Sequence, residues 1–122
     1  MDAEYYFDTY ALIEFVEGKE NYQRFQDTPI ITSFYNIYEF ACYLLRDHDR
    51  EKAERVLDKL NYNLIEPEED DLIPSAKFKL ENRSQQLSYV DCMGYRLAER
   101  HDLKFLTGDQ EFEDKENVEY VD

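Results

Sequence analysis

Four acidic residues occupy positions where carboxylates could carry out chemistry. Asp8 closes an apolar run and Asp109 follows another, while Glu39 and Asp91 lie inside helix-like segments. Unpaired carboxylates repel one another and stay ionised together only when a cation lies among them. Mg²⁺ and Mn²⁺ prefer oxygen ligands, and ions of this kind can activate water and orient a phosphodiester. If the four side chains converge, they therefore predict metal-dependent hydrolysis.

Three of these acids also have an ordinary structural interpretation. Asp8 could cap the helix that follows the first strand. Ser88 and Asp91 have the spacing of a capping box, in which each side chain bonds to the other's backbone. Asp109 could be a turn aspartate after Thr107-Gly108. Taken singly these signals are weak, and the functional interpretation depends on all of them meeting at one place.

Glu39 is the most informative of the four. Its segment, Phe34 to Leu45, is apolar nearly all round, so a carboxylate there needs a partner or a route to solvent. Arg46 could supply an ion pair on the same helix. Without such a partner, a carboxylate in this helix indicates a site.

The rest of the sequence predicts the elements that would position these acids. Short apolar runs alternate with longer amphipathic ones, which is typical of an α/β fold with a parallel sheet. We expect one domain over residues 1–122, with three α/β/α layers and a central sheet of four to five strands. The expected strands are 3–7, 29–32, 63–65, 103–106 and 118–121, and the expected helices are 10–16, 21–26, 34–46, 50–60, 70–83 and 88–99. If the first and fourth strands are neighbours, Asp8 and Asp109 approach each other at the carboxyl edge of the sheet, where ligands bind in such folds.

Composition limits the classes of function. The 122 residues carry a formal net charge of −15, which argues against electrostatic capture of nucleic acid by many Lys and Arg side chains. The best candidates for phosphate contacts are Lys77, Lys79 and Arg83, although they could simply be an exposed helix face. No long apolar run spans a membrane and the first residues do not resemble a signal peptide, so we expect a cytoplasmic protein. Cys42 and Cys92 are expected to be core thiols.

Four motifs together resemble the PIN domain family, and especially the VapC-type toxins of toxin–antitoxin pairs. They are Tyr6-Phe7-Asp8-Thr9, Ile37-Tyr38-Glu39-Phe40, Leu87-Ser88-Tyr89-Val90-Asp91-Cys92 and Phe105-Leu106-Thr107-Gly108-Asp109-Gln110-Glu111-Phe112. The resemblance implies an Mg²⁺- or Mn²⁺-dependent endoribonuclease that has a small antitoxin and a second copy of itself as partners. It implies that Asp8, Glu39, Asp91 and Asp109 are the catalytic acids, of which Asp8, Asp91 and Asp109 hold metal. Thr9 and Thr107 would then be supporting hydroxyls.

Two other functions remain open at this stage. The first is a non-catalytic PIN-like module that binds RNA or protein. The second is a receiver-type phosphoacceptor domain, which needs paired acids after its first strand and a lysine after its last, and this sequence has neither. The eleven tyrosines could stack on bases or form an oligomer interface, but most are expected to line the core and its rim.

Overall fold

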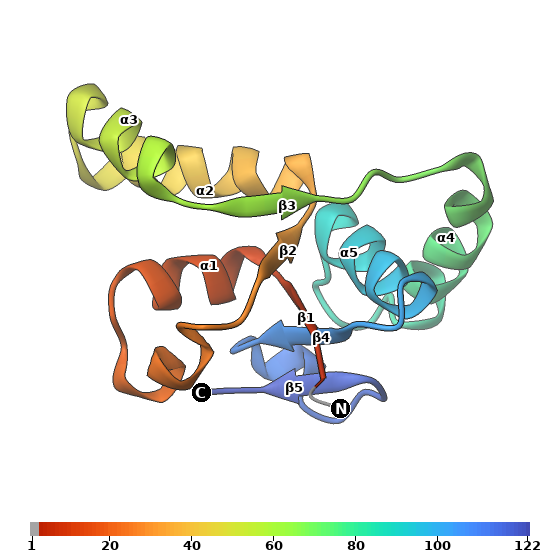
Figure 1. Cartoon of the computed structure of the whole chain (residues 1–122). Helices are drawn as coiled ribbons and strands as arrows, with labels where there is room; N and C mark the ends of the chain where they lie inside the picture. Colours follow the sequence, from red (N-terminus) through yellow and green to blue (C-terminus); the bar gives the residue numbers. More distant parts are fainter. Residues whose placement is uncertain (1–2) are drawn as a thin grey trace.

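The structure is a computed structural model that describes residues 3–122. Its centre is a five-stranded sheet with the order β3-β2-β1-β4-β5, in which every pairing is parallel (Figure 1). The strands are β1 (Tyr5–Phe7), β2 (Ile30–Thr32), β3 (Tyr62–Leu64), β4 (Lys104–Thr107) and β5 (Val118–Tyr120). The expectation that the first and fourth strands are neighbours is confirmed, and the strand order reverses at β1.

Helices cover both faces of this sheet and complete the three predicted layers. One face carries α1 (Thr9–Val16), α2 (Phe34–Asp47) and α3 (Arg50–Lys59), and the other carries α4 (Leu72–Glu81) and α5 (Tyr89–Arg100) (Figure 1). Three short 3₁₀ helices join them: η1 (Glu20–Phe25), η2 (Glu69–Asp71) and η3 (Gln110–Phe112). The α/β fold expected from the sequence is therefore confirmed.

The core divides into two halves because successive side chains of a strand point to opposite faces. Phe7 packs with Leu106 and with the first three helices, whereas the neighbouring Tyr6 packs with Phe105 and with α5. Tyr6 and Phe7 are both fully buried, which explains why the middle strand is apolar without alternation. Within residues 3–122, no helix is long and apolar enough to cross a membrane.

The helix starts follow the capping signals of the sequence. The Ser33 hydroxyl accepts a hydrogen bond from the backbone of Asn36 at the start of α2, and Ser88 does the same at the start of α5. The helix expected over residues 70–83 is shorter in the structure, because its first residues form η2 and it ends at Glu81. Pro74 lies in its first turn, where a missing N–H costs nothing.

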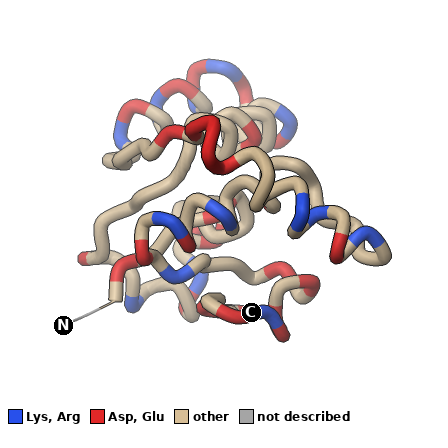
Figure 2. The backbone as a smooth tube through the Cα atoms, turned by 90° about the vertical axis from the view of Figure 1, so that its right-hand side faces the viewer, with Lys and Arg blue, Asp and Glu red and all other residues tan. Residues whose placement is uncertain are grey.

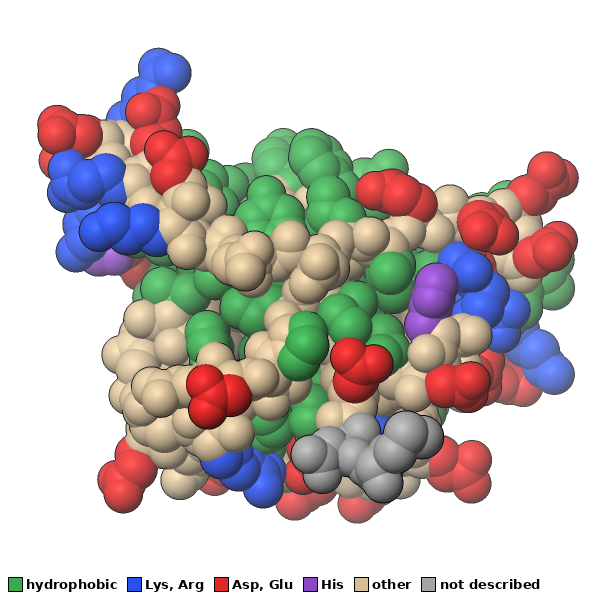
Figure 3. All heavy atoms as spheres, in the orientation of Figure 1, with side chains coloured by type: hydrophobic (Ala, Val, Ile, Leu, Met, Phe, Trp, Pro, Cys, Tyr) green, Lys and Arg blue, Asp and Glu red, His purple; other side chains and the backbone are tan. Residues whose placement is uncertain are grey.

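Two expectations about α2 are wrong. Cys42 is exposed rather than a core thiol, whereas Cys92 is buried as expected. The helix is also not buried all round, because Phe34, Tyr35 and Tyr38 are exposed. Hydrophobic side chains are visible at the top of the molecule over this helix (Figure 3). An apolar composition did not reveal that one face of α2 lacks a neighbouring element.

Acidic residues are spread over all layers, and several follow one another just before α4 (Figure 2). One of these acids, Asp71, is completely buried and binds two arginines of α5. Its carboxylate accepts hydrogen bonds from Nε of Arg96 at 3.0 Å and from Nε of Arg100 at 2.8 Å. This pairing fixes the start of α4 against the C-terminal half of α5, the helix that carries Asp91.

Candidate functional site

The site forms at the carboxyl edge of the sheet, where β1 and β4 end side by side. The backbone N–H of Asp8 donates to the carbonyl of Leu106 at 3.2 Å, which continues the strand pairing to the first site residue. The hydroxyl of Thr107 is hydrogen-bonded to the Asp8 carboxylate and accepts the backbone N–H of Asp109 at 3.0 Å. Thr107 thus joins two of the predicted acids.

Asp8 is buried, with only 2% of its surface exposed. Burial raises the pKa of its carboxyl to about 8; the hydrogen bonds from Thr107 and from the backbone of Ala11 oppose this shift, and the charges of Asp91 and Asp109 add to it. A carboxyl with this pKa takes up a proton at neutral pH unless a cation compensates its charge. The electrostatics of Asp8 therefore favour a bound cation.

Asp91 lies at the start of α5 and faces the same cluster. Its carboxylate accepts the backbone N–H of Ser88 at 3.3 Å, and its own N–H donates to the Ser88 hydroxyl at 3.0 Å, so the predicted capping box is confirmed. Burial raises the pKa of Asp91 and the hydrogen bonds to Ser88 lower it, while the charges of Glu39 and Asp109 raise it further. Asp8 and Asp91 are therefore each influenced by Asp109, and Glu39 joins this group through its effect on Asp91.

Glu39 reaches the site from α2 and is held by Thr9. The hydroxyl of Thr9 donates to Oε1 of Glu39 at 2.6 Å and accepts from the side-chain amide of Asn36 at 3.1 Å. The ion pair with Arg46 that the sequence allowed is not formed, since Arg46 instead lies 3.5 Å from Asp47. Thr9 therefore connects α1 to Glu39 and Asn36 of α2, and its supporting role in a site stays a prediction.

Asn36 is a site residue that the sequence analysis missed. Its buried side-chain oxygen accepts hydrogen bonds from the hydroxyls of Tyr6, at 2.5 Å, and Ser33, at 2.8 Å. Its amide then continues the chain of hydrogen bonds to Thr9 and Glu39. One feature of the sequence could have identified Asn36: it is a polar residue one helical turn before Glu39 in an otherwise apolar helix.

The capping interpretations of the three aspartates are confirmed, yet they do not compete with metal binding. Oδ1 of Asp8 accepts the N–H of Ala11 at 2.7 Å, and Oδ1 of Asp109 accepts that of Glu111 at 3.0 Å. Each bond uses one of the two oxygens of a carboxylate, and each carboxylate has about four lone-pair sites. A cap therefore leaves acceptor capacity for a cation.

The donor set suits a hard cation. The cluster offers carboxylate and hydroxyl oxygens, the ligand chemistry that Mg²⁺ and Mn²⁺ prefer. Among residues 3–122, however, no three Asp, Glu, His or Cys side chains are gathered closely enough to form a ready metal site. The acids are coupled through their charges, and ligation would require their side chains to draw together.

The three basic residues expected to contact phosphate lie in two places. Nζ of Lys79 donates to the carbonyl of Leu87 at 2.6 Å and lies 4.4 Å from the centre of the Tyr89 ring, beside the start of α5 that carries Asp91. Lys77 and Arg83 line a shallow pocket on α4 that none of the four acids borders. A phosphate contact by these residues stays a prediction.

The sequence model of the PIN domain matches residues 5–118, nearly the whole chain. The chain belongs to the PIN domain family. No curated protein sequence matches this PIN domain. Solved structures do match it, and the matches cover most of this chain and most of the other chain.

Three of those structures show the same fold at low sequence identity. A toxin–antitoxin complex from Klebsiella pneumoniae matches with a TM-score of 0.74 and 20% identity, covering 95% of this PIN domain and 96% of that chain. PAE2754 from Pyrobaculum aerophilum matches with a TM-score of 0.75 and 21% identity, covering 99% and 92%. VapC20 from Mycobacterium tuberculosis, a toxin that cleaves the sarcin–ricin loop, matches with a TM-score of 0.76 and 14% identity, covering 98% and 100%.

Proposed function

We propose that this PIN domain is a divalent-metal-dependent endoribonuclease and the toxin of a toxin–antitoxin pair. The observation that carries the proposal is the buried Asp8 carboxyl, whose pKa is raised to about 8 and which is electrostatically coupled to two further aspartates at a ligand-binding edge of the sheet. Structural ion pairs also perturb pKa values, but Asp8 has no arginine or lysine among the causes of its shift.

Asp8, Asp91 and Asp109 are the residues proposed to hold Mg²⁺ or Mn²⁺. A divalent ion bound there supplies a Lewis acid that activates water and offsets the charge of a phosphodiester. The protein supplies the positions: Thr107 is hydrogen-bonded to the carboxylate of Asp8, the backbone N–H of Glu111 donates to that of Asp109, and the backbone N–H of Ser88 donates to that of Asp91. These hydrogen bonds orient the carboxylates before the substrate arrives.

Glu39 is proposed to position the attacking water or the metal. Its Oε1 is held by Thr9, and Thr9 is in turn held by Asn36, so the carboxylate orientation is set by a buried network. The second carboxylate oxygen is then available to accept a proton from a water molecule in hydrogen-bonding reach. Thr9 is thus a positioning residue that acts through Glu39.

A small antitoxin is the proposed partner. One similar structure is a toxin–antitoxin complex and another is a toxin that cleaves RNA in the sarcin–ricin loop, which supports both the partner and the substrate class. A ribonuclease expressed alone would damage its own cell. Expression of the chain should therefore arrest growth, and Asp8→Asn should relieve the arrest.

A second copy of the chain is proposed to bind at the N-terminal ends of α4 and α5. A cleft of about 490 Å³ lies there, and most of its lining side chains are apolar: Tyr35, Pro67, Leu72, Tyr89, Val90 and Met93. Exposed apolar patches of this kind mark protein interfaces. Light scattering should give the mass of a dimer, and Leu72→Glu should convert it to a monomer.

Cleavage of a mixed pool of single-stranded RNA tests the proposed function. Wild-type protein should cut with Mn²⁺ or Mg²⁺ and not with EDTA, and Asp8→Asn should not cut. The matched control is Asp58→Asn, which makes the same change at an exposed position on α3. An Asp8→Asn variant that cuts at the wild-type rate would remove Asp8 from the site.

A non-catalytic PIN module is the second candidate. It is favoured by one observation, that the acids of the described chain are not gathered into a ready metal site. Calorimetry with Mn²⁺ distinguishes the two functions. Metal bound without any cutting of the RNA pool supports the binding module, and metal-dependent cutting supports the nuclease.

A further inference from the structure

Two pockets lie along the boundary between α1 and α2, and the first begins at the site. That pocket, of about 460 Å³, is lined by Thr9, Ile13, Tyr38, Glu39, Cys42, Tyr43 and Arg46. The second, of about 580 Å³, shares Ile13 and Tyr43 with the first and continues toward α3. We call the two together the α1–α2 groove.

We propose that single-stranded RNA leaves the acid cluster along the α1–α2 groove, with a base stacked on Tyr38 and with phosphates held by Arg46 and Lys52. This inference rests on the proposed nuclease function. It identifies the substrate path of that site and the class of nucleic acid that can enter it. Because Thr9 and Glu39 line the same groove, a strand lying in it has a phosphodiester at the proposed reacting residues.

Arg46 is well placed for a phosphate contact next to the site. It follows Glu39 by two turns of α2, roughly 10 Å along the helix axis. Its guanidinium lies 5.5 Å from the centre of the Tyr43 ring, which orients it over the groove, and 72% of the side chain is exposed. Its contact with Asp47 is long and exposed, and such pairs contribute little energy.

Tyr38 offers a stacking surface beside the catalytic acids. It precedes Glu39 in the chain, and 62% of its surface is exposed. A large exposed ring in a pocket that borders a polar site is a platform for a base, and stacking tolerates any sequence because every base has a π face. Stacking also needs no positive charge, which suits a chain with a net charge of −15.

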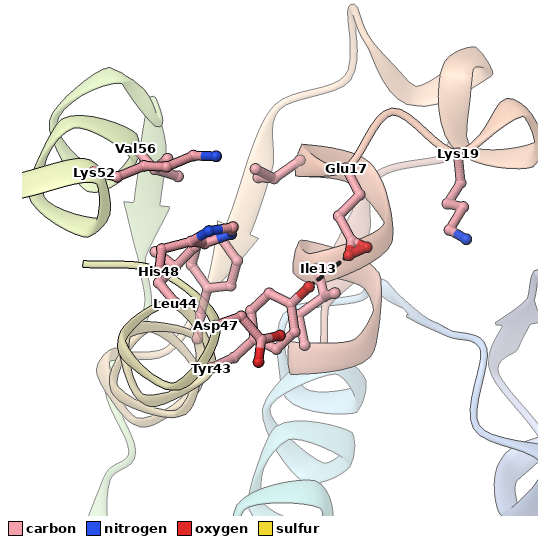
Figure 4. A pocket seen from close by; sticks show the side chains of 11 residues that line it. Ile13, Glu17, Lys19, Tyr43, Leu44, Asp47, His48, Lys52 and Val56 are labelled. Carbon is pink, nitrogen blue, oxygen red and sulfur yellow. Dashed lines mark hydrogen bonds between the residues drawn. The ribbon is translucent and has the colours of Figure 1, made fainter. Parts of the chain in front are cut away.

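The far part of the groove carries as many lysines as acids. Lys19, His48 and Lys52 line it together with Glu17 and Asp47, and the side chains of His48 and Lys52 lie across the groove from α1 (Figure 4). The Tyr43 hydroxyl donates to Glu17 at 2.5 Å, which fixes the position of one of the two acids. In a chain with 29 acidic and 14 basic residues, this surface is locally enriched in cations.

The groove also distinguishes unpaired from paired RNA. Stacking on Tyr38 requires a base whose face is free, and a duplex hides both faces of each internal base. The expected substrate is therefore a single strand or a loop. Lys77 on α4 and Arg83 just after it offer no comparable path, because no site acid borders the pocket that they line.

The test combines cleavage kinetics with RNA binding. Tyr38→Ala and Arg46→Gln should each raise KM for a mixed single-stranded RNA about tenfold and leave kcat nearly unchanged, because stacking and phosphate contacts act on binding. Tyr38→Phe keeps the ring and should behave as wild type. Arg50→Gln is the matched control, since it removes one exposed arginine at the start of α3 that lines neither pocket of the groove.

Binding is measured by fluorescence anisotropy of a labelled single-stranded RNA in the Asp8→Asn background, where no cutting is expected. Arg46→Gln should lower the slope of log affinity against log salt by about 0.7, the value for one lost phosphate contact on a single strand. Tyr38→Ala should weaken binding without changing that slope. The same RNA annealed to its complement should bind more weakly than the single strand.

Several results would overturn the inference. If wild-type protein cuts RNA while Tyr38→Ala and Arg46→Gln match the Arg50→Gln control, the path is wrong and the nuclease function stands. If wild-type protein neither cuts nor binds RNA, the proposed nuclease function and the proposed RNA path are both wrong. A loss of affinity in Lys77→Gln or Arg83→Gln alone would place the path on α4. A change in solution mass for Tyr38→Ala, with RNA affinity unchanged, would assign the surface to a protein partner.

Discussion

The Thr9 hydroxyl donates to Oε1 of Glu39 at 2.6 Å and so joins the first turn of α1 to the second turn of α2. These two residues lie 30 positions apart in the chain. The contact fixes the only predicted acid that comes from the middle of a helix. It also ties that helix to the strand end that carries Asp8.

Thr9→Val should impair the site more than the fold. The substitution keeps the shape of the side chain but removes the donor to Glu39 and the acceptor for Asn36, so we expect a loss of about 1 kcal/mol in unfolding free energy. Cleavage should fall because Glu39 loses its orientation. Thr9→Ser keeps the hydroxyl and should restore cleavage; equal rates for the valine and serine variants would show that the hydrogen bond is not used.

Asp8→Asn should stabilise the metal-free protein while abolishing its response to metal. Asparagine caps helices as well as aspartate does, and it has no charge to bury. Because burial raises the pKa of Asp8 to about 8, removing the ionisable group should raise the unfolding free energy by at least about 1 kcal/mol. Thermal unfolding with and without Mn²⁺ measures both effects. A wild-type Tm that does not rise with Mn²⁺ would count against a metal site at Asp8.

Gly94→Ala should destabilise the protein even though alanine favours helices. A Cβ atom at Gly94 would lie 2.9 Å from Cε1 and 3.0 Å from the hydroxyl oxygen of Tyr6, whose hydroxyl bonds to Asn36. Overpacking of this kind costs about 1–3 kcal/mol. Urea unfolding of Gly94→Ala, of Tyr6→Phe and of the double variant measures the coupling. Strictly additive losses would mean that the alanine does not act through the Tyr6 hydroxyl.

Asp71 should contribute to the loss of stability at acid pH. Burial by itself raises the pKa of Asp71, but hydrogen bonds from Arg100, from the backbone of Glu68 and from Arg96 outweigh it, so the net pKa lies below the usual value. The pKa of Asp71 is therefore lower in the folded state than in the unfolded state, where it is about 4. The ionised carboxylate stabilises the folded protein above about pH 4. This stabilisation is lost as the pH falls through the pKa of the folded state.

Asp71→Asn should therefore cost about 3 kcal/mol at pH 7, where it leaves two arginines without their partner, and much less in strong acid. Unfolding free energies measured from neutral pH down to below pH 4 should show a flatter acid limb for the variant. Glu68→Gln is the control, since it removes only an exposed contact with Arg100 at 3.6 Å. Parallel acid limbs for wild type and Asp71→Asn would contradict the assignment.

The two cysteines should differ in reactivity toward a thiol reagent. Cys42 is exposed on α2, whereas Cys92 is buried in α5 and burial raises the pKa of its thiol. Under native conditions one thiol per chain should be modified quickly, and the second only after unfolding. Cys42→Ser should abolish the fast phase; a fast phase that survives would show that α5 opens readily.

The positions of the site acids were predictable because they follow from general rules of the fold. Parallel strands end at one edge, so Asp8 and Asp109 could be placed together once their strands were taken as neighbours. Ser88 and Asp91 could be recognised as a cap from spacing alone. Local sequence determines these features, and the tertiary structure leaves them unchanged.

Other features depended on which surfaces remain uncovered, and sequence patterns do not contain that information. Cys42 and Tyr38 lie in an apolar helix, yet both are exposed in the structure of residues 3–122. Arg46 turned toward Asp47 and Tyr43 rather than toward Glu39. Asn36 became part of the site through Tyr6, which lies 30 residues earlier in the chain. Of these outcomes, only the contact of Asn36 with Tyr6 joins segments distant in sequence, whereas the exposure of Cys42 and Tyr38 and the orientation of Arg46 depend on how the rest of the fold surrounds α2.

The pairing of β1 with β4 has a consequence for the order in which the chain becomes functional. The two strands are separated by most of the chain, and contacts this distant in sequence form late and slow folding. During translation, Asp8 and Glu39 leave the ribosome well before Thr107 and Asp109 do. A nascent chain that ends before β4 therefore lacks part of the proposed site, which is completed only when β4 inserts beside the first strand.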